Sequence, residues 1–141
     1  SIGYDYFLSK STDIYIADTI GELGLFYNLV PVALIGGSLV PHGGQNPVEA
    51  IKLGAAVITG PHWRNFADAY EELLRAGGAV QVSDAQSLAT TALLLLENAQ
   101  ARARIMSRAE GAIARLGGAL PRTISELEQF LPPKATLQHA S

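Results

Sequence analysis

Residues 36 to 49 have the types and spacing of an anion-binding loop. The segment reads Gly-Gly-Ser-Leu-Val-Pro-His-Gly-Gly-Gln-Asn-Pro-Val-Glu, and it sets two glycine pairs, an Asn-Pro step and a carboxylate between apolar segments. Glycine lets the backbone approach a ligand closely, while the free N–H groups and the dipole at a helix N-terminus favour negative charge. A phosphate, phosphonate or carboxylate group would suit this loop.

The flanking segments place this loop between a strand and a helix. The apolar run at residues 32–35 predicts a buried strand, and Asn46-Pro47 followed by apolar residues at helical spacing predicts a capped helix start. The same alternation recurs along the chain, so we expect a βα repeat. The expected strands are residues 14–17, 32–35, 56–59 and 79–82, and the expected helices lie near residues 22–28, 47–53 and 66–76.

The predicted fold class is α/β, with a Rossmann-like, doubly wound parallel sheet and helices on both faces. Short apolar strands without alternation are typical of such a sheet, which binds ligands at the carboxyl ends of its strands. From residue 84 a helical tail is expected: Ser83-Asp84 caps a helix through Leu96, and Pro132-Pro133 ends the last helix. Another helix in this tail is predicted from an apolar face that comprises Ile105, Ala109, Ala112, Ile113 and Leu116. Residues 1–12 show no convincing strand-helix unit, and four strands are few, so further strands are expected upstream of residue 1.

The amino-acid composition argues against several classes of function. The chain has 141 residues, 48% hydrophobic and 16% charged, with a formal charge of −3. This acidic balance argues against a nucleic-acid surface. There is no cysteine, and His42, His62 and His139 lack paired metal-ligand spacing, so no metal is predicted.

Residues 23–41 are uncharged, but Asn28, Pro31 and a glycine pair interrupt them, so a soluble piece without a membrane span or signal peptide is expected.

The first two strand ends carry carboxylates that allow two interpretations. Asp18, Thr19 and Glu22 follow the first predicted strand and could contact a ligand or form a capping box. Glu49 lies at the start of a predicted helix, where it could complement the helix dipole. It could equally accept hydrogen bonds from the hydroxyls of a ribose, as carboxylates do in nucleotide sites.

The later candidates also have structural alternatives. His62 and Arg64 could meet an anion or lie in an exposed loop, and Asn65 is predicted to cap the next helix. Ser38 does not lie in a nucleophile elbow, so hydrolase chemistry is not expected. Basic charge on the late helices predicts a solvated face, with a membrane-facing role as the alternative; it comes from Arg102, Arg104, Arg108 and Arg115.

Three groups of motifs resemble the 3-deoxy-D-manno-octulosonic acid (Kdo) transferases. They are Asp-Thr-Ile-Gly-Glu-Leu at residues 18–23 with Phe26-Tyr27, the two parts of the glycine loop at 36–40 and 43–49, and Gly-Pro-His with Asn-Phe at 60–66. The likeness is close over residues 14–83. The helical tail, with Leu-Pro-Pro-Lys at 131–134, is similar as well.

The resemblance implies a GT-B glycosyltransferase, built from two Rossmann-like halves, that transfers Kdo from CMP-Kdo to a lipid A precursor in lipopolysaccharide core synthesis. It places the enzyme at the cytoplasmic face of the inner membrane. Residues 1–141 would be a partial C-terminal, nucleotide-sugar-binding domain, with βα units in 1–83 and mainly helices in 84–141. The N-terminal acceptor domain, with the membrane anchor and the general-base carboxylate, is absent from this sequence. No catalytic residue is therefore expected here, and an upstream arginine-containing donor-binding segment has no match.

The resemblance also implies which residues hold the donor. CMP is expected to contact Ile20, Gly21, Glu22, Asn46, Pro47, Val48 and Glu49, with Glu49 on the ribose. Gly36, Gly37 and Ser38 would line the sugar-phosphate cleft, and further candidate donor contacts are Gly43, Gly44, Gln45, His62 and Asn65. Backbone donors at a helix N-terminus can stabilise a leaving nucleotide monophosphate without a metal, so neither metal nor cofactor is expected.

Two other functions remain open from the sequence. The chain could be the donor domain of a transferase that uses a uridine diphosphate sugar, or a noncatalytic binding or assembly module whose glycine loop is structural. In the Kdo interpretation we expect the isolated chain to bind CMP weakly and to catalyse no transfer alone. A truncated sheet is also expected to pair with a second copy through its open edge.

Overall fold

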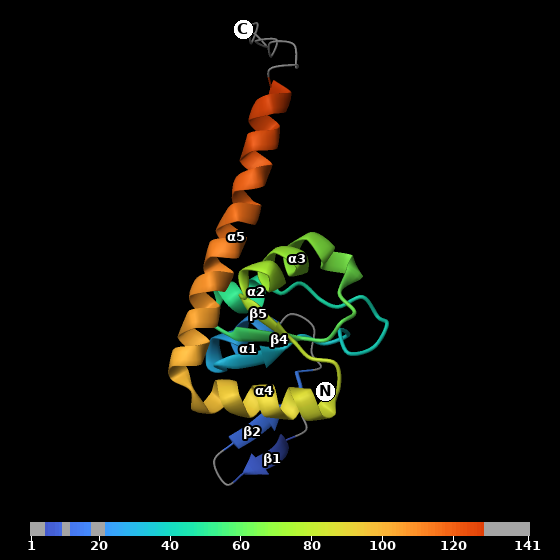
Figure 1. Ribbon diagram of the computed structural model, residues 1–141, viewed down its shortest axis with the longest axis vertical. Helices are drawn as coiled ribbons and strands as arrows, with labels where there is room; N and C mark the ends of the chain where they lie inside the picture. Colours follow the sequence, from blue (N-terminus) through green and yellow to red (C-terminus); the bar gives the residue numbers. More distant parts are fainter. Residues whose placement is uncertain (1–4, 10–11, 18–21, 129–141) are drawn as a thin grey trace, which may run out of the picture.

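The structure, a computed structural model, describes residues 5–9, 12–17 and 22–128, which form two separate sheets and five α-helices (Figure 1). An antiparallel pair is formed by β1 (Asp5–Ser9) and β2 (Thr12–Tyr15). A parallel sheet of order β3-β4-β5 is formed by β3 (Val32–Leu34), β4 (Ala56–Thr59) and β5 (Ala79–Gln81). The helices are α1 (Leu23–Leu29), α2 (Val48–Lys52), α3 (Ala67–Ala76), α4 (Ala85–Glu97) and α5 (Ala99–Glu128), with a 3-10 turn η1 (Arg64–Phe66) before α3.

Helices cover both faces of the parallel sheet, which confirms the predicted fold class (Figure 1). The central strand β4 is fully buried, and its alternating side chains point to opposite layers. Val57 packs with Leu73 of α3 and Ala109 of α5, whereas Ile58 packs with Leu95 of α4. Each such buried aliphatic side chain contributes about 1.5–3 kcal/mol. The start of α5 packs on the α4 side, and its middle crosses to cover α2 and α3.

The strand predicted at residues 14–17 does not join the parallel sheet, so its predicted strand pairing is wrong. β2 ends at Tyr15 and pairs antiparallel with β1, Tyr6 lying opposite Ile14. A connection this short can join only antiparallel neighbours, because a parallel partner needs a long crossover. Residues 5–9 form β1, a strand that is followed by another strand and not by a helix, and that the sequence pattern did not predict. In the described residues the parallel sheet has three strands and not four.

Of two predicted N-terminal helix caps, one forms and the other does not. Asp84 caps α4 as predicted: its Oδ1 accepts a hydrogen bond from Ser87 N at 2.7 Å, and Ser87 Oγ accepts one from Asp84 N at 3.2 Å. Asn65, in contrast, does not cap α3. The η1 turn intervenes, and Phe66 occupies the N-cap position without a side-chain cap bond. The predicted helix end at residues 132–133 lies outside the described residues.

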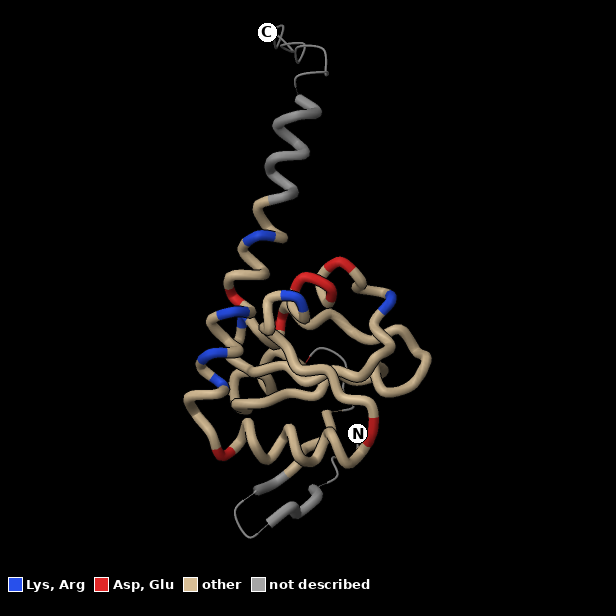
Figure 2. Tube along the Cα trace, viewed as in Figure 1, with Lys and Arg blue, Asp and Glu red and all other residues tan. Residues whose placement is uncertain are grey.

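Of the four arginines predicted to form a solvated face, Arg104, Arg108 and Arg115 are exposed, whereas Arg102 is half-buried. Figure 2 shows basic residues along α5. Arg102 Nη1 donates to the carbonyls of Leu95 and Leu96 at 2.5 and 2.8 Å and so caps the C-terminus of α4. Arg115 Nε donates to Glu72 Oε1 at 2.6 Å and ties α5 to α3. No helix in the described part of the chain combines the length and apolar character that crossing a bilayer requires.

The ion pairs of Glu72 predict a pH-dependent contribution to stability. The hydrogen bond from Arg115, and after it that from Arg75, holds the pKa of the Glu72 carboxyl below its usual 4.5. A lowered folded-state pKa adds stability above the unfolded value, and this stability is lost as the pH falls through the folded pKa. Glu72→Gln is therefore expected to lower the free energy of unfolding slightly at pH 7. The difference from the parent chain should shrink towards about pH 3.

Urea unfolding at both pH values measures this effect. Glu97→Gln, at the exposed end of α4, is the control and should change little at either pH. A Glu72→Gln difference of equal size at both pH values would argue against the assignment.

Candidate functional site

The loops after β3 and β4 are fastened together at the carboxyl edge of the sheet by Ser38. This residue is fully buried, and its hydroxyl donates to Ile35 O at 2.6 Å and accepts from Gly60 N at 2.8 Å. Its carbonyl accepts a hydrogen bond from His62 N at 2.9 Å. The Ser38 side chain is thus engaged within the protein. Its predicted place in the sugar-phosphate cleft stays a prediction, and only a role through the backbone fits this geometry.

The glycine pair at 43–44 is required by packing as well as by loop shape. Gly43 and Gly44 have φ values of 99° and 71°, a left-handed region that disfavours side chains. Gly43 O accepts from Asn65 N at 3.1 Å, and a Cβ on Gly43 would overlap the Asn65 side chain. Gly36 differs, because it is exposed and a Cβ there would meet nothing within 4 Å. Among these three glycines, Gly36 leaves open space for a ligand.

The N-terminal ends of α1 and α2 come together around Glu49. This exposed residue lies in the first turn of α2, and its Oε1 is 3.4 Å from the position of a Cβ on Gly24, in the first turn of α1. Burial, and after it the charge of Glu49, raises the pKa of Tyr27 on α1. The structure therefore brings Glu49 to the helix end where Glu22 is the N-cap residue.

Several predicted nucleotide contacts lie around this junction. Asn46 and Pro47 directly precede α2, and Asn46 Oδ1 accepts a hydrogen bond from Val48 N at 3.0 Å. Glu22 cannot complete a capping box as predicted, because it is itself the N-cap of α1 and makes no side-chain cap bond. Asp18, Thr19, Ile20 and Gly21 lie outside the described residues.

An aromatic pair behind the glycine loop was missed by the sequence analysis. Tyr70 is fully buried, and its hydroxyl donates to Gln45 O at 2.8 Å. Its ring stacks on Trp63, with centroids 5.8 Å apart, and Trp63 Nε1 donates to Gln81 Oε1 at 3.0 Å. The sequence did contain a signal for this contact. Tyr70 lies on the apolar stripe of a predicted helix, and a buried phenol needs a hydrogen-bond partner.

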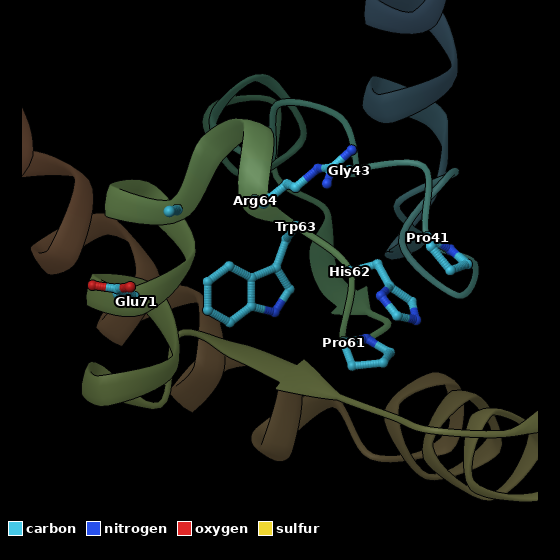
Figure 3. Close-up of a pocket in the computed structure, with 8 residues that line it drawn as sticks. Pro41, Gly43, Pro61, His62, Trp63, Arg64 and Glu71 are labelled. Atoms are coloured by element: carbon cyan, nitrogen blue, oxygen red, sulfur yellow. The ribbon is translucent and has the colours of Figure 1, made fainter.

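An open pocket of about 360 Å³ lies beside the glycine loop, next to α3 (Figure 3). It is lined by Pro41, Gly43, Pro61, His62, Trp63, Arg64, Ala67 and Glu71. Of the predicted donor contacts, Gly43 and His62 line this pocket, whereas Gly36 and Glu49 do not. The predicted contacts therefore fall into two groups, one around the α1 and α2 N-termini and one around this pocket.

Within the described ranges, no three His, Asp or Glu side chains gather as ligands for a metal ion. The fold and the site together define a Rossmann-like α/β domain with its candidate ligand groups at the carboxyl edge of a parallel sheet.

Comparison with known proteins gives the particular family. No family model matches the chain. It is 39% identical over 119 residues to the 3-deoxy-D-manno-octulosonic acid transferase of Bordetella pertussis, covering 84% of this chain and 28% of that protein. It is 34% identical over 124 residues to the enzyme of the same name from Haemophilus influenzae, covering 87% of this chain and 29% of that protein.

A solved structure agrees with these relatives. The chain resembles the C-terminal CMP-Kdo binding domain of WaaA from Acinetobacter baumannii with a TM-score of 0.67 and 33% identity, over 73% of this chain and 54% of that one. The chain belongs to the 3-deoxy-D-manno-octulosonic acid transferase family and spans less than a third of the length of these curated relatives. The resemblance inferred from the motifs is confirmed.

Proposed function

We propose that this chain is the donor-binding part of a GT-B enzyme that transfers Kdo from CMP-Kdo to a lipid A precursor at the inner membrane. The observation that supports it most directly is the position of Glu49 between the N-termini of α1 and α2. A nucleoside monophosphate needs hydrogen-bond acceptors for its ribose hydroxyls and positive potential for its phosphate. An exposed carboxylate beside two helix N-termini supplies both.

The proposed mechanism divides the work between this chain and a second domain. When the sugar leaves, negative charge builds up on the phosphate of CMP. The helix N-termini and the open backbone at Gly36 would stabilise that charge with fixed dipoles. Activation of the acceptor hydroxyl requires a base that this chain is not expected to supply. The isolated chain should therefore bind CMP and transfer nothing, and turnover of CMP-Kdo by this chain alone would contradict that division.

Glu49→Ala tests the nucleotide site. Losing a charged acceptor for two ribose hydroxyls is expected to weaken CMP binding by about 1–3 kcal/mol, or about five- to 150-fold in Kd. Isothermal titration of CMP into the parent chain and the variant measures the loss. Glu97→Ala is the matched control, because it removes an exposed carboxylate from the far end of α4.

A dideoxyribose analogue of CMP sharpens this experiment, because it lacks the hydroxyls that Glu49 is proposed to bind. Parent and Glu49→Ala chains should bind the analogue equally. Unchanged CMP affinity in Glu49→Ala would favour a noncatalytic module. If UDP, and not CMP, raises the melting temperature, the donor is a uridine diphosphate sugar.

Pairing of two chains through the free edge of β3 is a further proposal. β3 is an edge strand of the described sheet, and an unpaired edge can accept another strand. A monomeric mass in solution would exclude it.

A further inference from the structure

The pocket beside α3 carries opposite charges at its two ends. Figure 3 shows Arg64 and His62 on one side of the Trp63 ring and Glu71 on the other. Arg64 and Glu71 are both exposed, and neither forms an ion pair with any residue of the described chain. A ligand that offers an anionic group at one end and hydroxyl groups at the other would complement this pocket.

Arg64 is the one described cation at the carboxyl edge of the sheet. The other described Lys and Arg residues lie elsewhere: Lys52 ends α2, Arg75 lies in the last turn of α3, and the remaining arginines are on α5. A guanidinium matches a carboxylate with two parallel hydrogen bonds, and such pairs are stronger than neutral ones. A carboxylate arriving at this edge would therefore meet Arg64.

The Trp63 ring between the two ends is held in place before any ligand binds. It stacks on the buried Tyr70, and its Nε1 donates to Gln81 Oε1 at 3.0 Å. A fixed aromatic face can pack against the apolar side of a sugar ring without losing further side-chain freedom.

We propose that this pocket binds the sugar-acid part of the donor, with Arg64 on the carboxylate, Glu71 accepting hydrogen bonds from sugar hydroxyls and Trp63 against the sugar ring. The inference rests on the proposed function, because an octulosonic acid linked to CMP carries both kinds of group. The nucleotide then lies at the α1 and α2 N-termini. The sugar reaches past Gly43, which belongs to both the glycine loop and the pocket wall.

Titration of the full chain with CMP and with CMP-Kdo separates the two parts of the donor. Arg64→Gln is expected to weaken CMP-Kdo binding about tenfold to a hundredfold, and to change CMP binding less than about twofold. Glu71→Gln should act on the same ligand with a loss of about three- to tenfold, because neutral hydrogen bonds replace charged ones. Arg104→Gln and Glu110→Gln remove the same charges from exposed sites on α5, so they should leave both affinities unchanged.

Distinct outcomes separate this inference from the proposed function. If the parent chain binds CMP and CMP-Kdo equally, or if Arg64→Gln weakens both ligands alike, the sugar-acid site is wrong and the nucleotide site stands. Unchanged CMP-Kdo affinity in Arg64→Gln also overturns it. If the parent chain binds neither ligand, both the proposed function and this inference fall.

Discussion

Replacing Gly60 with alanine is expected to lower the free energy of unfolding by about 3 kcal/mol or more. Gly60 is buried, and a Cβ there would overlap the Ser38 carbonyl group and lie 2.6 Å from Leu39 N. These are backbone atoms, so no side-chain rotation can relieve the clash. The loops after β3 and β4 would have to separate and lose the hydrogen bonds from Gly60 N to Ser38 Oγ and from His62 N to Ser38 O.

Urea unfolding of Gly60→Ala beside Gly36→Ala measures this effect with a matched control. Gly36 lies in the same loop pair, is exposed and has open space around a Cβ position. Its replacement by alanine should change the free energy of unfolding by no more than about 0.5 kcal/mol. Similar losses in the two variants would show that loop flexibility, and not close packing at Gly60, sets the stability.

The parts of the fold that the sequence predicted are those with strong local patterns. β4 is an uninterrupted apolar run, and it is the buried central strand. Asp84 and Ser87 have the spacing of a capping box, and both bonds form. Helices on both faces followed from apolar strands that need cover on each side. These features depend on residues close together in the chain, so one sequence is enough to predict them.

The missed features depend on contacts between distant residues. The bond from Gly60 N to Ser38 Oγ spans 22 residues, and that from Tyr70 to Gln45 O spans 25. Periodicity cannot reveal that the Ser38 side chain faces inward to a neighbouring loop. Its place beside Gly36 and Gly37 in the sugar-phosphate cleft, which the family resemblance implies, stays a prediction. The pairing of β2 was missed for the same reason, because an apolar run does not say which strand it will meet.

Tyr70→Ala is expected to lower the free energy of unfolding by about 3–5 kcal/mol, as for other buried aromatic side chains. It removes the ring that Trp63 stacks on, together with the hydroxyl that anchors Gln45 O. Tyr70→Phe keeps the ring and should lose only about 1 kcal/mol, the net worth of one hydrogen bond. Losses of equal size in the two variants would mean that the hydroxyl, and not packing, dominates.

The pH dependence of Tyr70→Phe tests the hydroxyl separately. Burial raises the pKa of Tyr70 to about 12 from an ordinary 10.0. Because the folded-state pKa is the higher one, the stability from the protonated phenol is fully present below pH 10 and is lost as the pH rises towards 12. The parent chain should therefore lose stability between these values faster than Tyr70→Phe does. Parallel alkaline profiles for the two chains would mean that the hydroxyl is solvated and that Gln45 O is not anchored through Tyr70.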